Sequence, residues 1–125
     1  MNAEQIVTGG YAAFASGDMV SLGKIYHPEC KITFHGDHPL GGEYIGFDEL
    51  LPNMLGRLND AWPGFNLDID KVVSNDTDVV VFCTITADGG LSGQAVHHFV
   101  VKDGLEVSFD LYWDSGYWSK HCKIS

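Results

Sequence analysis

Basic residues are scarce in this sequence. Seven Lys and Arg side chains stand against 17 Asp and Glu, which gives a formal net charge of −10 at pH 7. No Lys or Arg cluster is present to neutralise the phosphates of a nucleic acid, and an acidic chain is repelled by these phosphates and by anionic lipids. The composition therefore predicts neither a nucleic acid nor a membrane as a partner.

Long hydrophobic runs and targeting segments are also missing. The longest apolar run, Val79 to Cys83, is far too short to span a bilayer. The first residues, Met-Asn-Ala-Glu-Gln, have no basic stretch followed by an apolar one, so no signal peptide is expected. Three cysteines are an odd number and have no C-x-x-C spacing, which favours reduced thiols over disulfides or a zinc site. Together these features predict a cytoplasmic protein.

Motifs for nucleotides, nucleophiles and metals are absent or weak. The sequence has no phosphate-binding glycine loop and no nucleophile elbow. The segment His35 to His38 contains residue types that bind metals, but a Gly and Pro loop does not converge them, so we expect no metal and no cofactor. The only arginine, Arg57, is expected to be exposed or paired with an acid, with an anionic ligand as the alternative.

What the sequence does contain is enough apolar side chains for one core. With 125 residues and 45% hydrophobic side chains, we expect a single domain over residues 1–125. Helical spacing predicts helices over 3–15, from 18 to just before Pro28, and over about 47–62. Alternation and turn residues predict strands at 30–35, 43–45, 65–73, 78–87, 93–102 and 105–113. The last four strands must form an antiparallel meander with helices on one face, which is an α+β fold.

Several segments carry a family resemblance. They are Tyr11 to Asp18, Ile25 to Cys30, Gly42 to Leu50, Lys102 to Gly104, Glu106 to Val107 and Tyr112 to Asp114. On these residues the chain resembles the nuclear-transport-factor-two-like superfamily over all but the last ten residues, and most closely its SnoaL-like polyketide-cyclase and ketosteroid-isomerase-like branch. The resemblance implies a cone-shaped, curved antiparallel sheet wrapped around N-terminal helices, the cystatin-like α+β barrel, with an apolar pocket inside. It also implies a homodimer.

Comparison with ketosteroid isomerases argues against that activity. The resemblance keeps one pocket tyrosine, Tyr26, at the end of the second predicted helix. The position of the general-base aspartate is Phe34 in this chain, and a third pocket tyrosine is replaced by Met54. The tyrosine of the first helix matches Gly10, with Tyr11 one residue away. Without the base, a proton cannot be shuttled between steroid carbons.

The segment His97-His98-Phe99 matches the strand that carries the protonated aspartate of those isomerases. The resemblance therefore gives His97 a place facing the pocket. The Arg and Asp pair of epoxide hydrolases would fall at Ala95 and His97, so that pattern is absent too. Alternation along the strand turns Ala95 and Phe99 inward with His97 and turns His98 outward.

Alternation on the last strand and residues from elsewhere in the chain complete the expected pocket wall. On the final strand it turns Phe109, Leu111 and Trp113 inward and leaves Asp110 and Tyr112 outside. The resemblance adds Phe34 and Met54 to the wall, and the helical segments add Leu58, Phe14 and Trp62, with plain core positions as the alternative for the last two. The expected wall is strongly apolar and consists of Phe14, Phe34, Met54, Leu58, Trp62, Ala95, Phe99, Phe109, Leu111 and Trp113.

An imidazole in such a wall loses hydration, which lowers its pKa. A neutral His97 is therefore a candidate general base or acid, with Tyr26 and Tyr11 as candidate hydrogen-bond donors to a substrate carbonyl or enolate. The alternative is a core histidine bonded to a tyrosine. Two function classes follow: a cofactor-free cyclase, isomerase or dehydratase acting on a hydrophobic carbonyl substrate, or a non-catalytic module that binds a small hydrophobic molecule or dimerises through its exposed sheet face.

Overall fold

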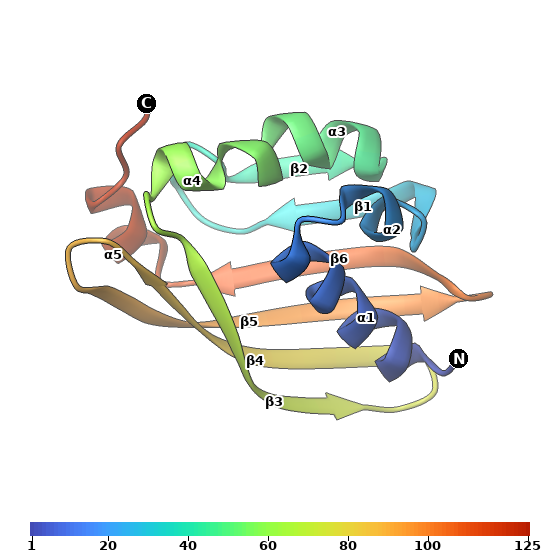
Figure 1. Ribbon diagram of the computed structural model, residues 1–125. Coiled ribbons are helices and arrows are strands. Elements are labelled where there is room, and N and C mark those ends of the chain that lie inside the picture. Colours follow the sequence, from blue (N-terminus) through green and yellow to red (C-terminus); the bar gives the residue numbers. More distant parts are fainter.

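Six strands form one curved sheet in the computed structural model, which describes residues 1–125 (Figure 1). The strands lie in the order β2-β1-β6-β5-β4-β3. Their bounds are β1 Tyr26–Phe34, β2 Gly42–Ile45, β3 Asn66–Ser74, β4 Asp78–Ala87, β5 Leu91–Lys102 and β6 Leu105–Trp113. The predicted meander from β3 to β6 is antiparallel throughout. Strand β1 joins β6 in parallel and β2 antiparallel, so the sheet is mixed, with β2 and β3 as its free edges.

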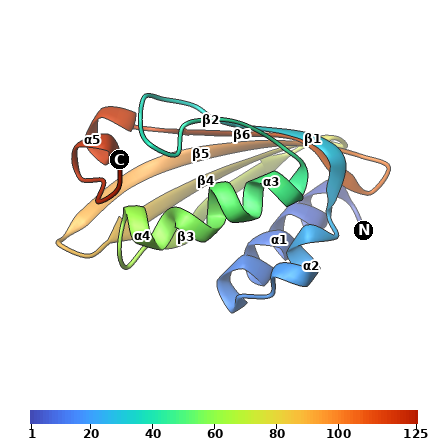
Figure 2. The same ribbon diagram turned by 90° about the horizontal axis from the view of Figure 1, so that it is seen from above.

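Four helices lie on the same face of this sheet, and the opposite face is left uncovered (Figure 2). They are α1 (Ala3–Ser16), α2 (Met19–Gly23), α3 (Gly46–Asn53) and α4 (Leu58–Ala61). A further short helix that the sequence did not predict, α5 (Ser115–Lys120), follows β6 at one end of the sheet. The predicted α+β fold, with helices against a curved sheet, is confirmed, and the sheet remains unclosed.

Helix α1 has clear start and stop signals. At its N-terminus the side chains of Asn2 and Gln5 exchange hydrogen bonds with each other's backbone N–H, a capping box. At its C-terminus Gly17 takes the left-handed conformation, with φ at 76°, that ends many helices. Ile6 and Val7 are buried, and α1 contacts β3, β4 and β5. The helix therefore lies across the inner face of the meander.

Two predicted helix boundaries are wrong. The second helix ends at Gly23 rather than just before Pro28, and Tyr26 begins strand β1 instead of ending a helix. The single helix predicted over 47–62 is divided into α3, a 3-10 turn (η1, Leu55–Arg57) and α4. The break lies at Met54, whose φ of −131° and ψ of −64° are not helical.

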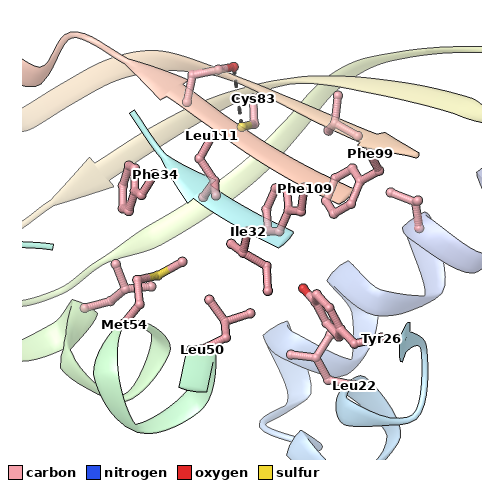
Figure 3. Close-up of a cluster of buried hydrophobic side chains, with 14 of the residues drawn as sticks. Leu22, Tyr26, Ile32, Phe34, Leu50, Met54, Cys83, Phe99, Phe109 and Leu111 are labelled. Atoms are coloured by element: carbon pink, nitrogen blue, oxygen red, sulfur yellow. Dashed lines mark hydrogen bonds between the residues drawn. The ribbon is translucent and has the colours of Figure 1, made fainter. Parts of the chain in front are cut away.

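The core fills the space between these helices and the sheet. It is one cluster of 24 buried hydrophobic residues. Figure 3 shows its centre, where Leu50 and Met54 on the helix side face Ile32, Phe34 and Leu111 on the strands. None of the helices has the length and apolar character needed to cross a membrane.

Candidate functional site

A cavity lies within this core, between the helices and the inner face of the sheet. The space open to the centre of a water-sized sphere is about 70 Å³, which exceeds the roughly 10–15 Å³ that one water needs. Of the 21 lining residues 18 are hydrophobic, and the other three are Gly10, His97 and Glu106. The cavity is therefore apolar, with an imidazole and a carboxyl as its exceptional groups.

Strands β5 and β6 form one wall of the cavity. Ala95, His97 and Phe99 of β5 line it, and their register partners on β6 are Trp113, Leu111 and Phe109, which line it as well. The intervening residue His98 lies on the opposite face, where its Nε2 is 2.8 Å from Oδ1 of Asp78. Successive residues of β5 thus alternate between the cavity and the opposite face at these positions.

The other predicted wall residues divide into two groups. Phe14, Phe34, Met54 and Leu58 line the cavity. Trp62 does not, although it is fully buried. Its indole Nε1 donates a hydrogen bond over 2.8 Å to the backbone carbonyl of Trp118 in α5. This bond holds the ring behind the wall, and the predicted pocket position of Trp62 is wrong because helix α5, which supplies the acceptor, was not foreseen.

His97 and Tyr11 form the first polar pair of the cavity. The Tyr11 hydroxyl lies 2.5 Å from Nδ1 of His97, and the two rings are nearly parallel, 9° apart. Burial lowers the pKa of His97 to about 3 and raises the pKa of Tyr11 well above its usual value of 10. The imidazole is therefore neutral near pH 7. Since Tyr11 occupies Nδ1 and nothing in the protein bonds Nε2, the latter nitrogen is free for a ligand.

Tyr26 and Glu106 form the second polar pair. They are register partners on the parallel strands β1 and β6, and Figure 3 shows the Tyr26 hydroxyl directed into the buried interior. Glu106 is 1% exposed. Desolvation raises the pKa of its carboxyl well above the usual range, and only an interaction with the Tyr26 hydroxyl opposes this. One oxygen, Oε1, is buried without any hydrogen-bond partner.

The family model for the SnoaL-like domain matches residues 7–109. The chain belongs to this SnoaL-like family. Among solved structures it is similar to an NTF2-like protein from Burkholderia thailandensis, with 25% identity, 97% of each chain covered and a TM-score of 0.84. A protein of unknown function with a cystatin-like fold from Xanthomonas campestris is 24% identical, with 97% of this chain and 98% of that chain covered and a TM-score of 0.85. TerC, which was co-crystallized with polyporic acid, is 21% identical, with 93% of this chain and 94% of that chain covered and a TM-score of 0.81. A comparison with curated proteins finds no match. Family and fold support a SnoaL-like protein with a ligand-binding pocket.

Glu106 is the residue of the SnoaL-like cavity that alternation missed. Counting back from Phe109, which faces inward, strict alternation turns Glu106 outward. However, Val100 pairs with Ser108 while Val101 pairs with Glu106, so Val107 is an extra residue on β6. Beyond this bulge, the side chains of β6 that would point outward point inward instead, so Glu106 points into the core. The residue order alone carries no signal for such a bulge.

The histidines of the 35–38 loop do not converge on a metal. His35 lies on the outer face with its Nε2 2.8 Å from Oδ1 of Asp110. His38 is buried against the rings of Phe34, Trp62 and Trp113, and both of its ring nitrogens lack a partner. No group of three or more His, Cys, Asp or Glu side chains is placed to hold a metal ion.

Proposed function

We propose that this cavity binds a small hydrophobic molecule that carries a carbonyl or hydroxyl oxygen, and that His97 exchanges a proton with it. The observation that carries the proposal is the His97 imidazole, buried on an apolar wall with Nδ1 bonded by Tyr11 and Nε2 free. The reaction class is a cofactor-free isomerisation, cyclisation or dehydration. Tyr26 is the further hydrogen-bond donor.

The wall favours an uncharged, flat ligand. The rings of Phe99 and Phe109 are stacked with centroids 4.0 Å apart and present an aromatic surface beside His97. No Lys or Arg lines the cavity, so a carboxylate or phosphate on the ligand would be buried without a counter-charge. TerC, which has the same fold, was co-crystallized with polyporic acid, and this supports a small-molecule ligand.

The Tyr11 contact gives His97 a way to carry a proton. The buried imidazole is a weak base because burial disfavours its charged form. When Nε2 takes a proton from the ligand, Nδ1–H donates to the Tyr11 oxygen and the positive charge is partly compensated. The Tyr11 hydroxyl, which then accepts from Nδ1–H, still has its own proton to donate to the negative charge left on the ligand oxygen, and Tyr26 donates to a second oxygen of the ligand.

The test compares two neighbouring histidines that face opposite ways. Native mass spectrometry of the purified protein identifies a co-purified ligand, and its affinity and turnover are then measured for His97→Ala and His98→Ala. We expect His97→Ala to lose turnover and to weaken binding, while His98→Ala retains both, since His98 lies on the outer face with Asp78. Equal effects of the two substitutions would contradict the role of His97.

A second candidate function is association of copies through the uncovered sheet face. Phe82, Val96 and Tyr112 are register partners across β4, β5 and β6, and Phe82 and Tyr112 are 40% and 45% exposed. Such an apolar row supports a homodimer, which we propose whether or not the cavity is catalytic. The three free cysteines support a cytoplasmic location. Light scattering tests the homodimer directly.

A further inference from the structure

Glu106 is a buried ionisable group of the cavity wall that the mechanism above does not use. Its Oε1 lacks a hydrogen-bond partner although the side chain is almost completely buried. A buried polar atom without a partner lowers stability, whereas a leucine at the same place would not. A bulge at Val107 is needed to turn the carboxyl inward at all. The residue is therefore placed at the expense of stability, which is typical of groups that bind a ligand.

The burial of the lining residues distinguishes an open end of the cavity from a closed one. Phe14, Leu55 and Phe65 are partly exposed and mark the opening. Glu106 and its register partner Tyr26 are buried and mark the closed end. A ligand that enters between α1, η1 and β3 consequently has Glu106 at its leading end.

The two polar pairs are separated by an apolar stretch. On β5, His97 and Val101 face the same side four residues apart, and Val101 is the register partner of Glu106. At about 3.3 Å per residue this corresponds to about 13 Å between the two backbone positions. The stacked rings of Phe99 and Phe109 lie between them.

We propose that Glu106 is a second ligand-binding residue of this cavity, and that the ligand is an elongated, flat apolar molecule with an uncharged hydroxyl or carbonyl group at each end. His97 binds the group nearer the opening and Glu106, with Tyr26 beside it, binds the leading one. The inference rests on the proposed function, because it places the same ligand against His97.

The chemistry of the closed end matches an uncharged oxygen group. A protonated carboxyl donates one hydrogen bond and accepts others, so it pairs with a hydroxyl or a carbonyl. Burial favours this protonated form of Glu106 because it raises the pKa of the carboxyl. An anionic group would meet a carboxyl with no Lys or Arg in the wall. A cationic group is the competing possibility, and the experiment distinguishes the two.

The experiment uses four probes on one rigid skeleton: biphenyl, 4-hydroxybiphenyl, 4,4′-dihydroxybiphenyl and 4-(aminomethyl)biphenyl. Calorimetry gives their affinities for the wild type, Glu106→Gln, Glu106→Leu and His97→Leu. In the wild type we expect the second hydroxyl to tighten binding about fivefold or more, as a buried hydrogen bond does. Glu106→Gln keeps this gain because its amide is neutral and polar, and Glu106→Leu abolishes it. His97→Leu weakens both phenols and leaves biphenyl unchanged.

The outcomes separate the two proposals. If 4-hydroxybiphenyl binds through His97 but the second hydroxyl adds nothing in the wild type, the Glu106 inference is overturned and the proposed function stands. Tightest binding of the amine, lost in Glu106→Gln, also overturns it, because the carboxyl then acts as an anion. If no probe binds, or if His97→Leu changes nothing, both proposals are overturned.

Stability provides a readout that needs no ligand. The double variant Tyr26→Phe with Glu106→Leu removes both polar groups of the closed end without opening a large cavity. We expect its urea midpoint to lie above that of the wild type, because a desolvated carboxyl with an unpaired oxygen is replaced by apolar atoms. A midpoint well below the wild type would assign Glu106 a structural role and overturn the inference.

Discussion

The buried His97 makes a quantitative prediction about stability at acidic pH. Its pKa is about 3 in the folded protein, against about 6.5 in an unfolded chain. Between about pH 6.5 and 3, His97 is protonated in the unfolded chain but remains neutral in the folded protein. The stability that depends on His97 is therefore fully present above pH 6.5 and is lost as the pH falls toward 3. Between pH 7.5 and 4 the loss is about 3 kcal/mol.

Urea unfolding followed by tryptophan fluorescence measures this loss directly. His97→Gln keeps a polar partner for the Tyr11 hydroxyl but cannot titrate, so its free energy of unfolding should fall about 3 kcal/mol less than that of the wild type between pH 7.5 and 4. His98→Gln is the matched control, because it removes an imidazole from the half-exposed outer face. The free energy of unfolding of His98→Gln should fall between pH 7.5 and 4 by most of the amount seen in the wild type. If all three proteins lose the same free energy, His97 is not buried as described.

Four further predictions concern other parts of the chain. The folded protein holds the proton of Glu106 more tightly than the unfolded chain, so the stability that depends on it is lost as the pH rises above about 4.5. Glu106→Gln should therefore gain stability over the wild type at pH 8 in the same urea series, and an equal difference at pH 4.5 and 8 contradicts this. Tyr11→Phe leaves Nδ1 of His97 unpartnered and should lower the free energy of unfolding by about 1–3 kcal/mol; an unchanged midpoint argues against the bond. Light scattering should give twice 13.7 kDa for the wild type and 13.7 kDa for Phe82→Lys with Tyr112→Lys, whereas a monomeric wild type at micromolar concentration rejects the dimer. Calorimetry should show one cooperative transition for residues 1–125, and two separable transitions would contradict a single domain.

The strand pattern could be predicted because one face of the sheet is buried. With inner residues such as Ala95, Phe99 and Leu111 packed in the core, alternation fixes which side chains face inward, and it distinguishes His97 from His98. Alternation fails only where the count of residues changes. The extra Val107 reverses the strand, so Glu106 is inside although the pattern predicts it outside.

The helices show a different limit of sequence reasoning. Apolar spacing located the segment from 47 to 62 but not the break at Met54, where packing against the strands overrides local preference. Residues 115–120 have too short a pattern to predict a helix. Without α5, the acceptor for the Trp62 indole could not be foreseen, and the ring was assigned to the pocket. Tyr11 was predicted as a hydrogen-bond donor to a substrate, with a histidine bonded to a tyrosine as the alternative. That Tyr11 is the tyrosine in contact with Nδ1 of His97 follows only from the packing of α1 on β5.

The most direct test of the account is a nitrogen NMR titration of the His97 imidazole, with and without 4-hydroxybiphenyl. The account predicts that the His97 ring nitrogens keep the shifts of a neutral imidazole from pH 8 down to about 4, because burial lowers the pKa to about 3. It also predicts that the probe shifts the signal of Nε2 in His97 and leaves His98 unchanged. If His97 titrates near pH 6.5, the imidazole is not buried as described. If its ring-nitrogen signals do not shift when 4-hydroxybiphenyl is added, His97 does not bind a ligand in the cavity.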